Sequence, residues 1–465
     1  MVRNRAGWVA VWAFALGSLI ATSPAAAIWE LGSGDNPAHI LHDHPHAGCA
    51  ACNANLGGGG DAEIADFRIN NRWTSTAITP LGVGARGTPL TLTWGFAQEG
   101  STIQSTRPSE ATGPSSLIAF LDSIRDPAST GGSDLTQRSW FSLFEESFGR
   151  LDELSGVTYV YEPNDDGANI SGAINSGTRG AQGVRADVRI GGHSIDGQSG
   201  SNTLAYNYFP AGGEMVLDTD NSNLYSSTLF NDLQFRQVIM HEAGHGLGLS
   251  HVESNNSNAL MEPFINLAFD GPQFDDILAL HRNYGDTREE NGGNNLPSTA
   301  DDLGTFGDGD VFALGTDAGN TSVVTPDMTD FVSIDDDSDF DWFRFTITEP
   351  AIVVDVTLTP QGPTYNEGPQ GSTQTALDTS ALSDLRLVLY DDQLNVIVDA
   401  DQTLAGGAES AAGVVLGPGD YYVFVSGSDN NVQMYRLDLA FTPEPVSALA
   451  LMGTLTLIGR RRRRP

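Results

Sequence analysis

Basic residues are scarce in this chain of 465 residues. Lys and Arg together number 23 against 59 Asp and Glu, which gives a formal net charge of −36. Proteins that bind a phosphate backbone rely on clustered basic side chains, so this balance argues against a nucleic-acid partner. An acidic chain rich in Gly and Asp suits an exported protein, in which the carboxylates either bind calcium or only keep the surface solvated. A chain of this length is expected to form about two or three domains.

Cysteine is almost absent. Cys49 and Cys52 are the only two, and they lie in a Gly-rich segment, residues 28–70, which also holds four of the nine histidines: His39, His42, His44 and His46. In an exported protein, two cysteines this close in sequence favour a local disulfide. Capture of zinc by the combined His and Cys side chains is an alternative.

Long apolar runs are missing as well. The N-terminal run, from about Gly7 to Ile20, is short for a membrane span. It follows Arg3 and Arg5 and precedes three alanines at 25–27. That order is typical of a secretory signal peptide, so residues 1–27 are predicted to be removed on export. A retained membrane anchor is the alternative.

The most informative stretch is the eleven-residue motif His241-Glu242-Ala243-Gly244-His245-Gly246-Leu247-Gly248-Leu249-Ser250-His251. His241 and His245 are one helical turn apart, so both imidazoles leave the same helix face and can hold one metal ion. Glu242 lies beside them, offset in angle, where it can take a proton from a metal-bound water.

Gly248 allows the helix to end and the chain to turn back, so that His251 can supply a third nitrogen. Three neutral histidines leave one tetrahedral position of a zinc ion open to water, whose pKa falls to about 7. The pattern therefore predicts one catalytic Zn²⁺, with Glu242 as general base. Two core histidines and a solvated third are the alternative, although so many glycines make a poor helix for packing alone.

Downstream lies Ala259-Leu260-Met261-Glu262-Pro263. A methionine after the zinc-binding histidines, followed shortly by a proline, resembles the Met-turn of the metzincin metallopeptidases, with Met261 beneath the metal. Residues 71–285 resemble the catalytic domain of the matrixins, the metzincin branch that contains the matrix metalloproteinases. The resemblance implies an α+β (α/β) domain with a mixed sheet and a zinc-binding helix.

The family also suggests a latency role for Cys49 or Cys52, in which a thiolate occupies the open zinc position. The PRCGxPD context of that switch is absent from this sequence. The disulfide, zinc capture and latency remain three open alternatives.

The pattern along this domain predicts strands at 89–96, 157–161 and 186–190 and an amphipathic helix over about 140–151. A closing helix is expected over 273–285, with Gly285 as its C-terminal cap and His281 at the surface or in the cap.

The match to matrixins is partial before the zinc helix. His193 and Asp196 resemble two ligands of the family's structural zinc. Tyr206 and Val216 stand where two further histidines are expected. With two ligands missing, we expect one zinc rather than two.

Calcium remains plausible in the same region. Asp196, Asp218 and Asp220 offer the hard oxygen ligands that calcium prefers. Solvated loop residues are the alternative for each of them.

Substrate contacts follow from the same resemblance. Residues 203–208, with Leu204 and Ala205, resemble the edge strand above the metal, to which a peptide adds through its backbone. Pro263, with Phe264 and Ile265, resembles the outer wall of the pocket beside the zinc. An apolar wall favours a hydrophobic residue just after the cleaved bond.

Beyond this domain, the composition of residues 286–298 indicates a linker. From 299 to 442, strand-like runs alternate with turn signals, which predicts an all-β sandwich. Three motifs resemble the bacterial pre-peptidase C-terminal domain, at 339–343, 387–391 and 419–423. This implies an accessory module for secretion, substrate or surface contact. Residues 335–341 either bind calcium or form a solvated acidic loop.

The last segment, residues 443–465, joins Pro443-Glu444-Pro445 to a short apolar run and then to arginines at 460–464. The run, 446–458, is brief for a bilayer, and the arginines should stay on the cytoplasmic side. Together they resemble the PEP-CTERM sorting signal, which implies transient membrane contact and removal by an exosortase-type machinery. A plain anchor is the alternative.

These observations predict a secreted zinc metalloendopeptidase that acts on a protein or peptide substrate and is localised at the cell surface or outside the cell. The alternative is a non-catalytic envelope or extracellular-matrix adhesion protein with a protease-like domain. Intact Glu242 and three intact histidines favour the enzyme, because a site that no longer catalyses hydrolysis need not keep all four residues.

Overall fold

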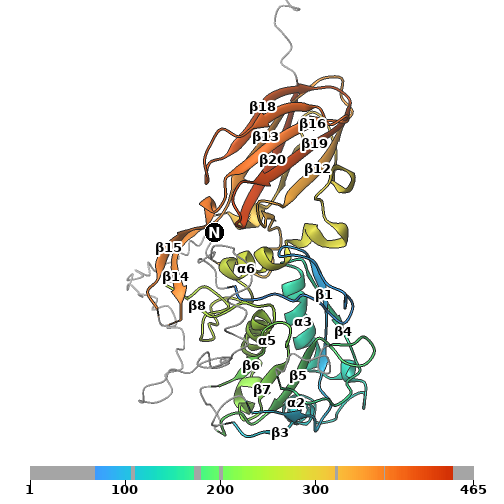
Figure 1. Ribbon diagram of the computed structural model, residues 1–465, viewed down its shortest axis with the longest axis vertical. Coiled ribbons are helices and arrows are strands. Elements are labelled where there is room, and N and C mark those ends of the chain that lie inside the picture. The colour runs from blue at the N-terminus through green and yellow to red at the C-terminus, as the bar shows by residue number, and fades with distance from the viewer. Residues whose placement is uncertain are drawn as a thin grey trace, which may run out of the picture.

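The computed structural model describes residues 69–105, 110–171, 180–197, 203–319, 323–370 and 372–443. An α/β domain that carries the histidine motif lies at one end, and a β-sandwich lies at the other (Figure 1). The predicted signal peptide, Cys49 and Cys52, and the sorting signal after Pro443 lie outside the described residues. Within the described ranges, no helix is long and apolar enough to cross a membrane.

A five-stranded sheet organises the first domain, in the order β4-β1-β5-β7-β6. Its parallel strands are β1 (Leu90–Phe96), β4 (Val157–Tyr161), β5 (Val188–His193) and β7 (Met215–Asp218). The short strand β6 (Ala205–Asn207) runs antiparallel to β7 at one edge. The predicted mixed sheet is confirmed, and so is the edge position of the strand expected at 203–208.

Two helices pack against this sheet and against each other, α3 (Phe141–Asp152) and α5 (Leu233–Gly246). The apolar face of α3 meets Trp94 of β1, whose ring centroid lies 4.9 Å from that of Phe148. Phe144 meets Phe235 of α5 edge-on at 5.5 Å. Every residue of α5 except Gln234 is buried, so its side chains are fixed by their neighbours rather than by solvent.

The remaining elements of this domain are short: β2 (Thr102–Ile103), β3 (Gly113–Pro114), α2 (Leu117–Arg125), η2 (Leu135–Gln137), α4 (Ser222–Tyr225), β8 (Val252–Ser254) and α6 (Phe274–Tyr284). Helix α6 confirms the predicted closing helix, and the Gly285 N–H caps it by donating to the His281 carbonyl. The expected surface position of His281 is wrong. Its side chain is fully buried between the Ser333 hydroxyl and the Leu154 carbonyl, at 2.9 Å from each.

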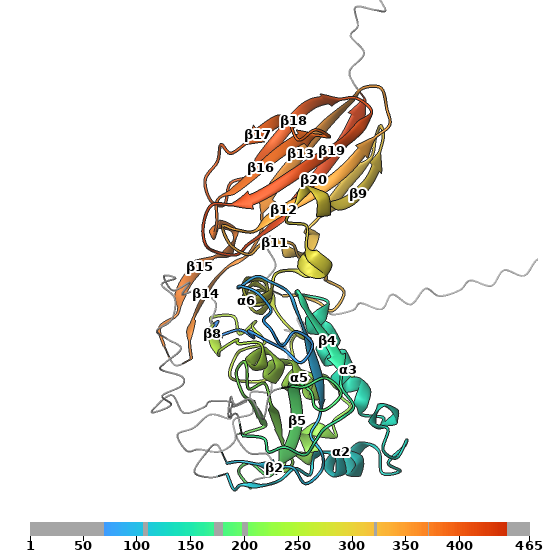
Figure 2. The same ribbon diagram turned by 45° about the vertical axis from the view of Figure 1, so that its right-hand side comes forward.

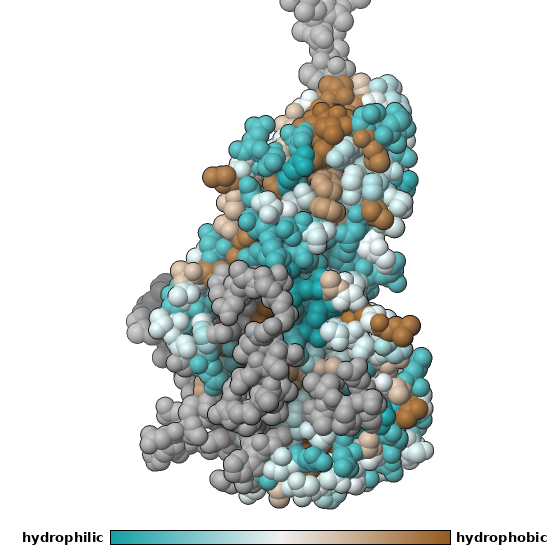
Figure 3. Space-filling view, viewed as in Figure 1, coloured by the Kyte–Doolittle hydropathy of each residue, from teal (hydrophilic) through white to brown (hydrophobic). Residues whose placement is uncertain are grey.

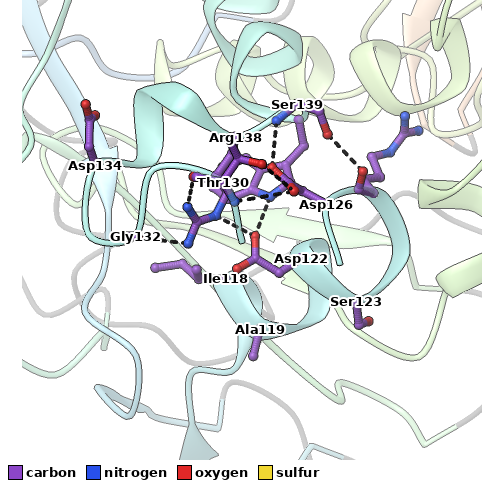
Figure 4. A network of polar contacts seen from close by, with 12 residues as sticks. Ile118, Ala119, Asp122, Ser123, Asp126, Thr130, Gly132, Asp134, Arg138 and Ser139 are labelled. Carbon is purple, nitrogen blue, oxygen red and sulfur yellow. Dashed lines mark hydrogen bonds and ion pairs between the residues drawn. The ribbon is translucent and has the colours of Figure 1, made fainter. Parts of the chain in front are cut away.

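The loop between α2 and α3 is held by a buried arginine (Figure 4). Arg138 Nε pairs with Asp122 Oδ1 at 2.8 Å, and the guanidinium also donates to the carbonyls of Thr130 and Gly132. The same Asp122 oxygen accepts from Trp140 Nε1 at 2.9 Å. Arg138 and Asp122 thereby join the loop to the start of α3.

The C-terminal part is mostly β, as predicted. One sheet has the order β10-β20-β13-β18 with β11 paired to β20, and the other has the order β17-β16-β19-β12-β9. The strands are β9 (Asp301–Phe306), β10 (Val311–Leu314), β11 (Ser333–Ile334), β12 (Phe340–Ile347), β13 (Ile352–Pro360), β16 (Leu385–Asp391), β17 (Val396–Ala400), β18 (Glu409–Leu416), β19 (Gly419–Gly427) and β20 (Gln433–Pro443). Inward side chains alternate along β12 and β13 and form one core between the sheets.

The segment predicted as a linker is an ordered junction. Residues 286–298 form the 3-10 turns η3 (Thr287–Gly292) and η4 (Pro297–Thr299) and bury Asp286, Glu289 and Asn294. Across the junction, Arg282 of α6 donates to the Asp335 carbonyl at 3.0 Å. Figure 3 shows hydrophilic residues gathered around this junction and hydrophobic residues toward the far end of the sandwich.

A hairpin leaves the sandwich after β13 and reaches the first domain (Figure 2). Its strands, β14 (Thr364–Pro369) and β15 (Thr375–Asp378), form a three-stranded sheet with β8. Tyr365 and Leu377 of the hairpin belong to the core of the first domain. No pattern in the sequence indicates this connection, because it joins segments more than a hundred residues apart.

The substitution Arg138→Ala is expected to lower the free energy of unfolding by about 1–3 kcal/mol, because it removes the cation that pairs with Asp122 and leaves two carbonyls without their buried donor. Urea unfolding of the purified protein measures this. The control Arg386→Ala removes a pair with Asp399 in which both side chains are 44% exposed, and should cost less than about 1 kcal/mol. Equal effects of the two substitutions would contradict the role of Arg138.

Candidate metal centre

Helix α5 and the turn after it bring three imidazoles together. His241 and His245 lie on the last turns of α5, and His251 follows the helix. His251 Nε2 lies 3.1 Å from His241 Nε2 and 3.2 Å from His245 Nε2. Two nitrogens on one tetrahedral zinc, each about 2.0–2.1 Å from the metal, are about 3.3 Å apart. The Nε2 atoms therefore converge with the spacing that one zinc ion requires.

The opposite nitrogen of each ring faces an oxygen. His241 Nδ1 lies 2.7 Å from the Leu260 carbonyl, and His245 Nδ1 lies 2.6 Å from the Leu249 carbonyl. His251 Nδ1 lies 3.0 Å from Gln370 Oε1. An oxygen acceptor requires the proton on Nδ1, which leaves the Nε2 lone pair for a metal. Burial, together with the nearby His251, lowers the pKa of His241 to about 3, so this ring is neutral as a ligand must be.

The end of α5 is shaped by groups from distant parts of the chain. Trp73 Nε1 donates to the Gly246 carbonyl at 2.8 Å, and the Tyr284 hydroxyl donates to the Leu247 carbonyl at 2.8 Å. These bonds satisfy carbonyls that a helix end otherwise leaves unpaired. Gly248 follows with φ +94°, and a Cβ there would lie 1.8 Å from the Asn71 carbonyl oxygen.

Met261 lies against the helix at the motif, because a Cβ on Gly244 would come within 2.5 Å of the Met261 sulfur. Helix α6 holds this turn: Asp276 Oδ2 accepts from the Leu260 N–H at 2.6 Å, and Oδ1 accepts from the Met261 N–H at 3.1 Å. The carbonyl of Leu260 is the acceptor for His241. A continuous hydrogen-bonded path therefore runs from α6 through the methionine turn to the first histidine.

Glu242 follows His241 on α5 and is fully buried. Its place in the helix is the one predicted for a general base, adjacent to the ligands but offset in angle. Three imidazole ligands, with the Glu242 carboxylate beside them rather than among them, fit a zinc ion with one position left for water or substrate.

The residues expected at secondary metal sites divide into two groups. Asp196, Asp218 and Asp220 lie together, with one carboxylate oxygen from each within 4.8 Å of the others. Burial, together with these neighbouring charges, raises the pKa of Asp218 to about 7. Since Asp218 also accepts from the backbone N–H groups of Ile195 and Asp220, part of its charge is already compensated.

His193 joins a different cluster. Its Nε2 lies 2.7 Å from Glu110 Oε1, which also accepts from the Tyr206 hydroxyl at 2.8 Å. Val216 lies in a small apolar core that includes Tyr206. The structure therefore pairs the His193 imidazole with the Glu110 carboxylate, for which the sequence gives no signal. His193 lies opposite Asp218 in the register of β5 and β7, but its imidazole does not belong to the group of three aspartates.

Of the residues expected at the substrate site, Leu204 and Ala205 lie at the start of β6, which packs against α5. Ala205 is buried on the edge strand β6, and the Leu204 carbonyl accepts from the Asp218 N–H at 2.8 Å. Phe209, just after β6, meets His245 edge-on at 5.7 Å. Pro263 is buried, and Phe264 after it is 41% exposed.

A third acidic cluster lies at the junction of the two domains. Glu289, Asp339 and Asp341 are buried, and one carboxylate oxygen from each lies within 4.8 Å of the others. Burial and the neighbouring carboxylates raise the pKa of Glu289 to about 11 and that of Asp335 to about 8. Asn294 is fully buried beside Asp341, and its side-chain amide interacts with the Asp341 carboxyl.

The sequence indicates residues 335–341 as candidate acidic ligands, but Glu289 and Asn294 join them only in the structure. The Asn and Glu content of residues 286–298 was the available signal, and it was interpreted as a linker. Gln370 and Glu110 carried no local signal, because each reaches its histidine only through the fold.

The substitution Gly248→Ala should lower the free energy of unfolding by more than about 1–3 kcal/mol, the usual cost of a positive φ, since the added Cβ also meets a backbone oxygen. Thermal or urea unfolding measures the effect. Gly100→Ala is the matched control, because Gly100 has φ +86° with nothing within 4 Å of its Cβ position. A cost no larger than that of the control would contradict the close approach of Asn71.

Comparison with known families agrees with this geometry. Residues 135–285 match the profile of the Matrixin family, and this segment includes α3, α5, α6 and the histidine motif. Human Matrix metalloproteinase-15 is 38% identical over 98 residues, which are 20% of this chain and 14% of that protein. The matched segment is therefore a small part of the relative, and the match supports a metallopeptidase in general.

The similarity of this chain to solved structures is weaker than its similarity to the Matrixin family. The pre-peptidase C-terminal domain of a collagenase from Bacillus anthracis shows 16% identity and a TM-score of 0.18, covering 30% of this chain and 93% of that one. A family GH115 4-O-methyl-alpha-glucuronidase shows 11% identity and a TM-score of 0.17. The match covers 48% of this chain and 24% of the glucuronidase. TM-scores this low do not establish a shared fold.

Proposed function

We propose that this protein is an exported zinc metalloendopeptidase whose centre is His241, His245 and His251. The observation that carries the proposal is the convergence of three Nε2 atoms at zinc spacing while every Nδ1 faces an oxygen acceptor. When bound, the metal supplies an activated water and polarises a carbonyl. The matrixin match of the same segment supports a metallopeptidase domain, and the intact Glu242 beside the three histidines favours an enzyme over an adhesion protein.

Glu242 is the proton carrier in this proposal. It takes a proton from the attacking water and later gives one to the leaving amine, which is the work of a general base and acid held close to the reacting atoms. Its burial keeps bulk water from competing for that proton. Met261 and the turn around it support the histidines from below.

Substrate binding is assigned to the edge strand β6 and to the chain after Met261. A peptide that adds to β6 through its backbone would be recognised with broad sequence tolerance. Pro263 and Phe264 would then form an apolar wall that selects a hydrophobic residue just after the cleaved bond. The export and surface-sorting signals at residues 1–27 and 443–465 belong to this proposal, with the sandwich as an accessory module.

The test is hydrolysis of an unfolded protein by the purified wild type and by Glu242→Gln. The variant should keep its zinc and lose activity by about 10²–10⁴-fold, because only the proton carrier has changed. A chelator should abolish hydrolysis by the wild type, and added zinc should restore that hydrolysis. Zinc-loaded wild type that cuts no peptide bond, or a variant as active as the wild type, would refute the proposal.

The junction cluster is proposed as a calcium site. Three buried carboxylates crowded together destabilise each other unless a cation compensates them, and calcium takes six to eight oxygen ligands of this kind. The buried Asn294 beside Asp341 adds an amide oxygen to the carboxylates, which is a further ligand type that calcium accepts. Asp196, Asp218 and Asp220 are a second candidate for calcium.

The junction cluster predicts an inverse pH dependence for the metal-free protein. The folded-state pKa values of Glu289 and Asp335, about 11 and about 8, lie above the ordinary value of about 4. The native state therefore binds more protons than the unfolded state, and stability should fall as the pH rises from about 4 toward 8 and above.

The unfolding midpoint in a chelator should consequently rise on acidification from about pH 9 to pH 6. Excess calcium should raise the midpoint most at high pH, where the carboxylates are ionised. Glu289→Gln should reduce both the change of the midpoint with pH and the rise of the midpoint with calcium, because it removes one ionisable carboxyl from the cluster. A metal-free midpoint that falls over this acidification, with no response to calcium, would contradict the site.

A further inference from the structure

The contact of His251 differs from those of the other two histidines. His241 and His245 are fixed by α5 and donate to backbone carbonyls of their own domain. His251 follows the helix on a turn, and its Nδ1 faces a side chain, Gln370 Oε1, at 3.0 Å. Gln370 belongs to the hairpin that leaves the sandwich. The histidine with the least support from the helix is therefore the one that the second domain contacts.

The strand register between β14 and β8 places Gln370 beside His251. In the antiparallel ladder between β14 and β8, Glu367 is opposite Ser254, Gly368 is opposite Glu253 and Pro369 is opposite Val252. One step further along the same register, Gln370 comes opposite His251. The contact is thus a continuation of strand pairing rather than an isolated approach of two long side chains.

The hairpin is anchored along its length. The Tyr365 hydroxyl donates to Asp275 Oδ1 of α6 at 2.7 Å, and the Tyr365 ring is buried in the core of the first domain. The Asn255 N–H donates to the Asn366 carbonyl at 2.9 Å, and the Asn366 N–H donates to Asn255 Oδ1 at 3.1 Å. At the base, the Thr379 hydroxyl donates to the Pro363 carbonyl at 2.7 Å.

From this arrangement we infer that Gln370 is a positioning residue for the third zinc ligand, so that the sandwich domain completes the metal centre of the first domain. The amide oxygen of Gln370 accepts the Nδ1 proton of His251, which selects the tautomer with a free Nε2 lone pair and fixes the plane of the ring. The inference rests on the proposed zinc function of the three histidines.

Zinc affinity of the purified full chain tests it, measured by competition with a chromophoric chelator. Loss of a partner that orients a metal-binding histidine typically weakens affinity by about 10–100-fold, so Gln370→Ala should release zinc at least about tenfold more easily. Gln370→Glu keeps the acceptor and adds charge, which makes the ring a stronger donor, so it should hold zinc at least as tightly as the wild type.

Asn255→Ala is the matched control, because it removes a contact between the hairpin and the first domain without touching His251. It should leave zinc affinity within about twofold of the wild type. Cobalt(II) spectra of the same proteins add a readout of ligand geometry, which should change in Gln370→Ala alone. Unfolding curves of the metal-free proteins establish that each variant is folded.

Unchanged zinc affinity in folded Gln370→Ala, beside a wild type that binds zinc, would overturn this inference alone. Equal weakening in Gln370→Ala, Gln370→Glu and Asn255→Ala would also overturn it, because the hairpin would then matter only through packing. A wild type that binds no zinc at all would refute the proposed function, and this inference with it.

Discussion

The protein depends on three imidazole rings that face inward with one nitrogen and outward with the other. The inward Nε2 atoms crowd to within 3.1 and 3.2 Å of His251, which is tolerable because burial keeps His241 neutral and each Nδ1 donates to an oxygen. If any acceptor were lost, the ring could turn or its proton could move to the metal-facing side. The rest of the fold supplies those acceptors.

Helix α6 links the centre to the second domain. Asp276 holds the methionine turn whose carbonyl accepts from His241, and its neighbour Asp275 accepts from Tyr365 of the hairpin. Toward the C-terminal end of the helix, His281 and Arg282 bond to Ser333 and Asp335 of the sandwich. One short helix therefore contacts the metal centre, the hairpin and the junction, so the two domains are not independent modules joined by a tether.

The electrostatics of the junction differ from those of the metal centre, because the junction buries carboxylates and the metal centre buries imidazoles. At the centre, neutral donors need only a cation to complete them. At the junction, buried carboxylates repel one another, and their raised pKa values express the cost of ionising them in the absence of a partner. The closeness of Glu289 to Asp339 and Asp341 joins the segment after α6 to the first strands of the sandwich, so compensation of this charge also fixes the domains together.

The sequence by itself determined the local features. The spacing of His241 and His245, the glycine at 248 and the apolar periodicities identify the helix that carries two histidines, the turn that brings in the third, the main strands and the β-rich C-terminal part, because these depend on helix and strand geometry over a few residues. Tertiary structure alone decided the partners of those residues. Gln370 reaches His251 across 119 positions of sequence, Glu110 reaches His193 across 83, and Glu289 meets Asp339 only after the supposed linker folds. A hydrogen bond between distant segments leaves no period in the sequence, so only the folded chain could reveal which residues support the site.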